Sequence, residues 1–235
     1  MNAHTESELL ALATRLVEEA ADLIRAIRAK GFETQTKTDS SPVTEADTTA
    51  EAHILRGLRA ATPDIPVVAE EEVAAGLQTA VAPTYWLVDP LDGTREFAAG
   101  RDDFTVNIGL VRDGRAFLGA MSLPAYHQTY WGGVGLGAFR RDSRGEQAIH
   151  VRKAPAEGLS VLASRHHADD VRLAEYLNGR NIASLGNIGS AGKFVLVAEG
   201  LVDFYPRLGP TMEWDTAAPQ GRVQDAGGQI TTLDG

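Results

Sequence analysis

The 235-residue chain contains no cysteine, and its longest apolar runs fall well short of the roughly 18 residues of a membrane span. Without cysteine there are no disulfides, no thiolate zinc or iron–sulfur sites and no cysteine nucleophile. The N-terminal segment 1–8 also lacks the basic and apolar parts of a secretory signal peptide. These absences predict a cytoplasmic protein without a transmembrane segment.

An excess of positive charge is missing as well. Lysine and arginine total 22 against 32 aspartates and glutamates, which gives a formal net charge of −10. No block of basic residues offers the face that duplex nucleic acid binds, so we expect no nucleic-acid polymer as a partner. Hydrophobic residues make up 43% of the chain and charged residues 23%, as in soluble globular proteins, and the length suffices for a buried core.

Apolar spacing predicts a helix over residues 5–30 and a second helix from Thr44 through Leu58. The polar stretch 33–43 between them predicts a loop or lid. Short apolar runs then predict strands, and Asp113-Gly114 predicts a hairpin turn between two of them. The predicted strands are 65–69, 85–88, 105–111, 116–123, 128–131, 159–163, 183–185, 202–205 and 229–233, and the later helices are 169–177, 190–199 and one after Trp214.

A boundary falls within residues 142–158, which contain a turn sequence and Pro155. We therefore predict an N-terminal α+β domain, residues 1–145, and a C-terminal α/β domain, residues 146–235. The first would carry most of the metal ligands described next. The second would carry the last ligand and the loops that contact substrate.

Residues 86–94, WLVDPLDGT, are the most informative stretch of the chain. An apolar strand leads into Asp89 and Asp92, and Pro90 and Gly93 turn the chain between and after them. The two carboxylates should converge at one strand end, where they repel each other unless a cation lies between them. Oxygen ligands of this kind suit Mg²⁺ rather than zinc.

Other acids follow strands or begin helices. Glu70–Glu72 follow a short apolar strand, Asp215 lies near the start of the last predicted helix, and Asp47 lies early in the second helix. Each has an ordinary structural explanation as a solvated loop, an N-cap or a charge that favours the helix dipole. Their joint occurrence around residues 86–94 indicates a metal site more specifically than any one of these acids does alone.

The order of these motifs, DPLDGT at 89–94 with EE at 70–71 and WD at 214–215, resembles the inositol monophosphatase superfamily of Mg²⁺-dependent, lithium-sensitive phosphatases. The resemblance spans roughly residues 38–228. It implies a layered α/β/α/β/α sandwich of the inositol monophosphatase and fructose-1,6-bisphosphatase type. Four stretches are most similar to the CysQ-type 3′(2′),5′-bisphosphate nucleotidases: DGTREF at 92–97, SRHH at 164–167, GSAGK at 189–193 and YPRLGPTMEWDTAA at 205–218.

Carried over by position, the resemblance implies that Glu70, Asp89 and the Leu91 carbonyl hold one Mg²⁺, and that Asp89, Asp92 and Asp215 hold a second. A third ion is left open. This arrangement matches two-metal activation of water for phosphoryl transfer.

The resemblance also implies that Thr94 and Asp47 orient or deprotonate the attacking water, with Glu70 sharing this catalytic role. The backbone N–H groups of Gly93 and Thr94 would face the phosphate. Lys193, near the start of a helix, would bind a second phosphate. The other implied substrate contacts are Arg165, His167, Gly189, Ser190, Arg207 and Asp215.

The implied activity is hydrolysis of the 3′-phosphate of adenosine 3′,5′-bisphosphate to AMP and phosphate. Alternatives are an inositol-1-phosphate or other sugar-phosphate phosphatase, and a catalytically silent metal-binding scaffold. The residues Arg95-Glu96-Phe97 and Lys193 favour the nucleotidase. A homodimer is also an expectation, and a peripheral location at the inner membrane, suggested for some relatives, has no visible anchor here.

Overall fold

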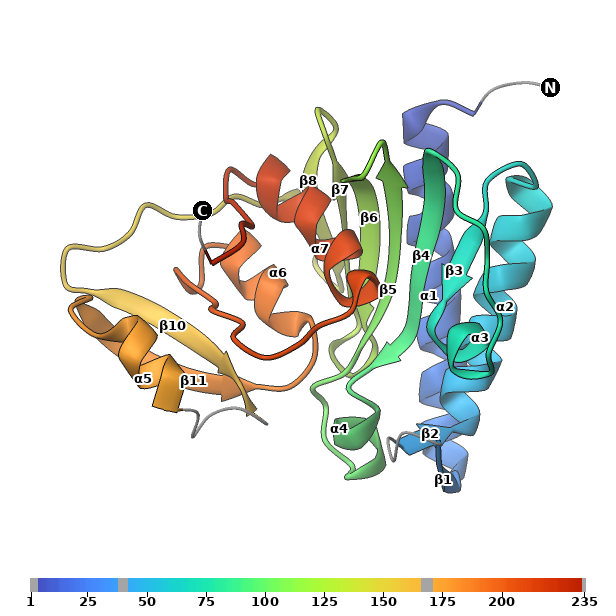
Figure 1. The fold of residues 1–235 in the computed structure, drawn as a ribbon, viewed down its shortest axis with the longest axis horizontal. Helices are drawn as coiled ribbons and strands as arrows, with labels where there is room; N and C mark the ends of the chain where they lie inside the picture. Colours follow the sequence, from blue (N-terminus) through green and yellow to red (C-terminus); the bar gives the residue numbers. More distant parts are fainter. Residues whose placement is uncertain (1–3, 38–41, 166–170, 234–235) are drawn as a thin grey trace.

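The computed structural model describes residues 4–37, 42–165 and 171–233. Five layers follow one another across the molecule (Figure 1): two helices, a large sheet, two helices, a small sheet and a short helix. This is the α/β/α/β/α order that the resemblance to the inositol monophosphatase superfamily implied. Within the described ranges, no helix is long and apolar enough to cross a lipid bilayer.

The first layer consists of α1 (Glu6–Lys30) and α2 (Glu45–Ala61), which pack against each other and against the large sheet. Both begin with a capping box, in which Thr5 or Thr44 exchanges hydrogen bonds with the acid three residues later. The apolar stripe of each helix is buried in the main core. Both helices confirm the sequence prediction.

The large sheet has seven strands in the order β3-β4-β5-β6-β7-β8-β9, of which only the β3–β4 pair is parallel. A hairpin joins β5 and β6 at Asp113-Gly114, as predicted, and β8 and β9 are strands that the apolar runs did not reveal. The strands are β3 (Val67–Ala69), β4 (Thr84–Asp92), β5 (Thr105–Arg112), β6 (Arg115–Leu123), β7 (Gln128–Gly133), β8 (Gly137–Asp142) and β9 (Gly145–Ala148).

Helix α7 (Glu213–Asp225) lies on the opposite face of this sheet from α1. Two strand glycines allow a very close approach: a Cβ at Gly109 would lie 2.7 Å from the Ala218 nitrogen, and one at Gly119 would lie 2.5 Å from the Ala218 oxygen. No larger residue fits at either position without moving the helix. The close contact brings the N-terminus of α7, with Asp215, to the sheet edge where β4 ends (Figure 1).

The small sheet pairs β10 (Leu159–Ser164) with β11 (Ile182–Ile188) in parallel, with α5 (Val171–Leu177) on one face and α6 (Gly192–Ala198) on the side of α7. The strand predicted at 202–205 is wrong: only an isolated bridge joins Phe204 to Val161. The strand predicted at 229–233 is also wrong: among the described residues this segment has no strand or bridge partner, and it lines a cavity instead.

Short elements surround the ends of the large sheet: β1 (Thr34–Thr36), β2 (Pro42–Thr44), α3 (Glu70–Ala74), α4 (Thr94–Ala98) and a 3₁₀ turn (Pro124–Tyr126). The predicted loop 33–43 therefore contains a small antiparallel pair, and its centre lies outside the described residues. The division into residues 1–145 and 146–235 stays a prediction. Strand β9 continues to Ala148, and α7 packs on β5 and β6, so the two segments share a core.

Candidate metal centre and active site

The site begins where β4 leaves the sheet. The pairing of β4 with β5 shifts register between Asp89 and Asp92, so the predicted turn between the two acids is a bulge within the strand. Gly93 follows with φ 94°, a left-handed conformation that begins α4, and a Cβ there would lie 2.8 Å from the Asp103 carbonyl oxygen. Asp89 Oδ1 accepts the Leu91 N–H at 3.0 Å, which fixes its carboxylate.

Asp89 and Asp92 meet Asp215 from α7, with one oxygen of each carboxylate within 4.8 Å of the others. Burial, together with the charges of Glu70, Asp92 and Asp215, raises the pKa of Asp89 well above its ordinary value. Burial and Asp215 raise the pKa of Asp92 to about 7. Converging, buried oxygen donors that repel one another are stabilised by a hard divalent cation, so this donor set fits Mg²⁺.

Glu70 begins α3 and lines the same pocket as the three aspartates. Its Oε1 accepts a bond from Lys37 Nζ at 3.0 Å, and the same ammonium lies 2.6 Å from Glu71 Oε1. Burial lowers the pKa of Lys37, but the two glutamates outweigh this effect and raise it. In this arrangement Lys37 is an ion-pair partner of Glu70.

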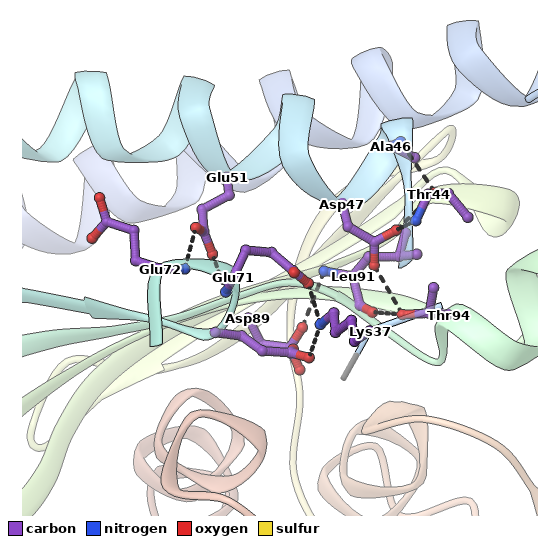
Figure 2. A network of polar contacts seen from close by, with 11 residues as sticks. Lys37, Thr44, Ala46, Asp47, Glu51, Glu71, Glu72, Asp89, Leu91 and Thr94 are labelled. Carbon is purple, nitrogen blue, oxygen red and sulfur yellow. Dashed lines mark hydrogen bonds and ion pairs between the residues drawn. The ribbon is translucent and has the colours of Figure 1, made fainter. Parts of the chain in front are cut away.

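Asp47 is buried in the first turn of α2, and its carboxylate faces the end of β4 (Figure 2). Oδ1 accepts the Thr94 hydroxyl at 2.9 Å, while Oδ2 accepts the N–H and the hydroxyl of Thr44, each at 2.7 Å. The Leu91 carbonyl lies 3.0 Å from the same Thr94 oxygen. Burial raises the pKa of Asp47 despite these bonds. Asp47 and Thr94 are thus a fixed pair beside the carboxylate cluster.

Two cavities that share residues open over this end of the sheet. One, of about 370 Å³, is lined by predicted ligands and catalytic residues: Glu70, Asp89, Leu91, Asp92, Gly93, Thr94 and Asp215. The other, of about 530 Å³, adds side chains from the C-terminal half, including the predicted contacts Ser190, Lys193 and Arg207. The structure therefore brings the predicted metal ligands, Thr94 and several predicted substrate contacts to two adjoining cavities, with Asp47 buried behind Thr94.

Lys193 is only 1% exposed, and its ammonium donates to the carbonyl oxygens of Ile188 and Gly189, both at 3.1 Å, and of Ser190. Burial lowers its pKa to about 8, although Asp92 opposes this effect. Ser190 has φ 50°, and the next N–H, that of Ala191, donates to Asp92. In this structure Lys193 stabilises the turn before α6 and adds positive charge beneath the cavity wall.

Three predicted substrate contacts either do not line the two cavities or lie outside the described residues. Arg165 pairs with Asp103 at 2.5 Å and lies 3.8 Å from Glu96. Gly189 lies directly against Glu96, where a Cβ would come within 2.7 Å of the side chain. His167 lies outside the described residues. The substrate roles of these residues stay predictions.

Sequence patterns did not single out Lys37 or Glu51, which both contact α3. Nothing in a polar loop distinguishes one lysine from another, so Lys37 carries no local signal. Glu51 does carry one, because it lies on the apolar stripe of α2 beside Ala50 and Ile54 and is 4% exposed. A charged residue on a buried helix face requires a hydrogen-bonding partner, and the alternation of Glu51 with apolar neighbours in the sequence indicates such a position.

The fold and the site together define a layered α/β protein with a carboxylate centre for divalent metal. The sequence profile described as the inositol monophosphatase family matches residues 5–235. The chain belongs to the inositol monophosphatase family.

Individual relatives agree with this assignment. The 3′(2′),5′-bisphosphate nucleotidase CysQ of Salmonella typhimurium is 42% identical over 223 residues, which cover 94% of this chain and 89% of that protein. CysQ of Escherichia coli K12 is 40% identical over the same lengths. Among solved structures, CysQ from Bacteroides thetaiotaomicron matches with a TM-score of 0.78 at 30% identity, covering 96% of this chain and 89% of that one. The Thermotoga maritima IMPase matches with a TM-score of 0.80 at 26% identity, covering 96% and 86%.

Proposed function

We propose that this protein is a Mg²⁺-dependent phosphatase that hydrolyses the 3′-phosphate of adenosine 3′,5′-bisphosphate. Water attacks the phosphorus, the bond to the 3′-oxygen breaks, and AMP and inorganic phosphate leave. The observation that carries the proposal is the three-aspartate cluster in one cavity with Thr94, whose hydroxyl is hydrogen-bonded to the buried Asp47. The choice of substrate is supported by the nucleotidase relatives at 40–42% identity.

Two or three ions belong to the proposal. Glu70, Asp89 and the Leu91 carbonyl would hold one, and Asp89, Asp92 and Asp215 would hold another. When bound, the metal supplies charge neutralisation at the phosphoryl group and lowers the pKa of water.

The protein's own groups orient the reactants. The Thr94 hydroxyl donates its proton to Asp47 Oδ1 at 2.9 Å, so it would accept a hydrogen bond from the attacking water and align that water with the phosphorus. The backbone N–H groups of Gly93 and Thr94, at the start of α4, are donors for phosphate oxygens. Asp92 is held in place by the Ala191 N–H, which connects the two halves of the site.

The second phosphate would meet positive charge from the C-terminal half of the cavity, supplied by Arg207 and by Lys193 beneath the wall, with Ser190 and Asp215 as further contacts. A cytoplasmic location, a small phosphate ester as substrate and a homodimeric assembly belong to the same proposal.

Arg207→Ala should raise KM for adenosine 3′,5′-bisphosphate roughly tenfold to a hundredfold, because a charged contact to phosphate is lost. Adenosine 3′-monophosphate, which lacks the second phosphate, should be hydrolysed with nearly unchanged KM. Steady-state phosphate release on both substrates measures the difference. Equal losses on both would contradict the assignment of Arg207 to the second phosphate.

A second candidate is an inositol-1-phosphate or other sugar-phosphate phosphatase. The observation that favours it is the structural similarity to the Thermotoga maritima IMPase, with a TM-score of 0.80. Phosphate release should be measured in parallel from adenosine 3′,5′-bisphosphate, inositol-1-phosphate and fructose-1,6-bisphosphate with Mg²⁺. We expect the nucleotide to have the highest kcat/KM. A preference for inositol-1-phosphate would favour the second candidate, and no release from any of them would favour a catalytically silent scaffold.

A further inference from the structure

Helix α3 has five residues and begins at Glu70, and no side chain from its own N-cap position accepts a hydrogen bond from its first turn. The residue before it, Ala69, has no side chain that can accept a hydrogen bond. The first backbone N–H groups of a helix have no partner within the helix and need one from elsewhere. The partner here comes from a different part of the chain.

Glu51, on α2, supplies that partner. Its carboxylate accepts the Glu71 N–H at 2.8 Å and the Glu72 N–H at 2.9 Å, one through each oxygen (Figure 2). Both donors lie in the first turn of α3, directly after Glu70. One buried side chain therefore fixes the backbone from which Glu70 projects.

The position of Glu51 is unusual for an acid. It is 4% exposed on the apolar face of α2, and burial, with the charges of Glu71 and Glu72, raises its pKa to about 7. A helix cap needs no acid surrounded by other acids, since serine, threonine or asparagine caps equally well. What Glu51 adds is reach across the gap between α2 and α3 and two acceptors in fixed geometry.

Asp47 lies four residues earlier, one turn along the same face of α2 (Figure 2). Asp47 holds Thr94, and Glu51 holds the turn that bears Glu70. Buried alanines at positions 46 and 50 keep this helix face closely packed, so both carboxylates are anchored to the same rigid element.

We infer that Glu51 is a positioning residue for the metal centre. From α2, its carboxylate caps the N-terminus of α3 and thereby orients Glu70. The inference rests on the proposed role of Glu70 as a metal ligand. It assigns α2 two tasks: alignment of Thr94 through Asp47, and alignment of a metal ligand through Glu51.

The test is direct binding of Mg²⁺ by calorimetry, and of Mn²⁺ by electron paramagnetic resonance, to the metal-free protein without substrate. Glu51→Ala should weaken metal binding by about tenfold or more, the usual effect of losing a group that orients a ligand. The metal affinity of Glu51→Gln should lie between those of Glu51→Ala and the wild type. The glutamine amide oxygen can accept one of the two N–H groups, but its NH₂ group faces the other. At saturating metal, kcat should fall by a smaller factor than the metal affinity.

Asp225→Ala is a matched control. Asp225 also caps backbone N–H groups, those of Gly135, Leu136 and Gly137, at 3.0–3.2 Å. It lies at the far end of α7 from Asp215, about 15 Å along the helix. Its loss should lower Tm and leave metal affinity unchanged.

The inference would be overturned if Glu51→Ala bound metal as tightly as the wild type, or if its metal affinity fell no more than that of Asp225→Ala. If Glu51→Ala does not fold, Glu51→Gln decides, and unchanged binding by that variant is the contrary result. Failure of the proposed function looks different: the wild type would bind metal, and Glu51→Ala would bind it less well, but no phosphate ester would be hydrolysed.

Discussion

Asp89→Asn should abolish phosphatase activity and, at the same time, raise the Tm of the metal-free protein. The carboxylate is 1% exposed and adjoins Glu70, Asp92 and Asp215, so without metal its charge is opposed by burial and by its neighbours. Asparagine removes the charge and keeps an oxygen for the Leu91 N–H. Activity should fall by about 1000-fold or more, because the ligand assigned to both ions is lost. A gain of a few degrees in Tm corresponds to about 1 kcal/mol in a chain of this size.

Calorimetric unfolding with EDTA and with Mg²⁺ measures both effects. Mg²⁺ at about 100 times its Kd should stabilise the wild type by about 2.7 kcal/mol and the variant much less. The matched control is Asp203→Asn, since Asp203 is compensated by Arg152 at 2.8 Å and by the Ser160 N–H, and its loss should lower Tm. A metal-free Asp89→Asn less stable than the wild type would contradict this account.

The same charges give the metal-free wild type a pH dependence. The pKa of Asp92 is raised to about 7 in the folded state, so the folded protein binds more protons than the unfolded chain between about pH 4 and 7. The contribution of Asp92 to the free energy of unfolding therefore falls as pH rises through that range. Saturating Mg²⁺ should remove most of this slope.

Thr94→Ala should lower kcat by about 10²- to 10⁴-fold with little change in metal affinity. The hydroxyl is held by Asp47 Oδ1 and lies at the start of α4, where it would align water. Thr94→Ser keeps the hydroxyl and should retain much of the activity. Asp47→Asn should cause a loss of similar size, because the same hydrogen bond is disturbed.

A double-mutant cycle tests whether the two residues act as a unit. Groups that share one task do not lose activity multiplicatively, so Thr94→Ala combined with Asp47→Asn should be nearly as active as either single variant. The measurement is kcat at saturating Mg²⁺ for the four proteins. Fully multiplicative losses would show that Asp47 and Thr94 act separately.

Some residues of this site could be predicted from the local sequence, and others could not. Asp89 and Asp92 follow an apolar strand and flank a proline, so their convergence was predictable from neighbouring residues alone. Asp215 belongs to a helix that joins them only through tertiary packing, and its role came from the resemblance to a family. Lys37 has no pattern that marks it, since its position depends on how β1 and α3 approach each other.

The two failed strands have a common cause. Residues 202–205 and 229–233 have β-forming side chains, but strand formation requires a neighbouring strand with free hydrogen-bonding groups. Phe204 forms a single β-bridge to Val161, and residues 229–233 line the cavity without pairing with a described strand. The helices over 5–30 and 44–58 were predictable because their hydrogen bonds are local.

The glycine pair under α7 has a consequence for how the protein is made. Glu70, Asp89 and Asp92 leave the ribosome well before Asp215, which joins them only when α7 settles on Gly109 and Gly119. Long-range docking of this kind is a late event in folding. A nascent chain would therefore lack one of the proposed metal ligands through most of translation, and the proposed metal centre would be complete only in a chain whose last helix has docked.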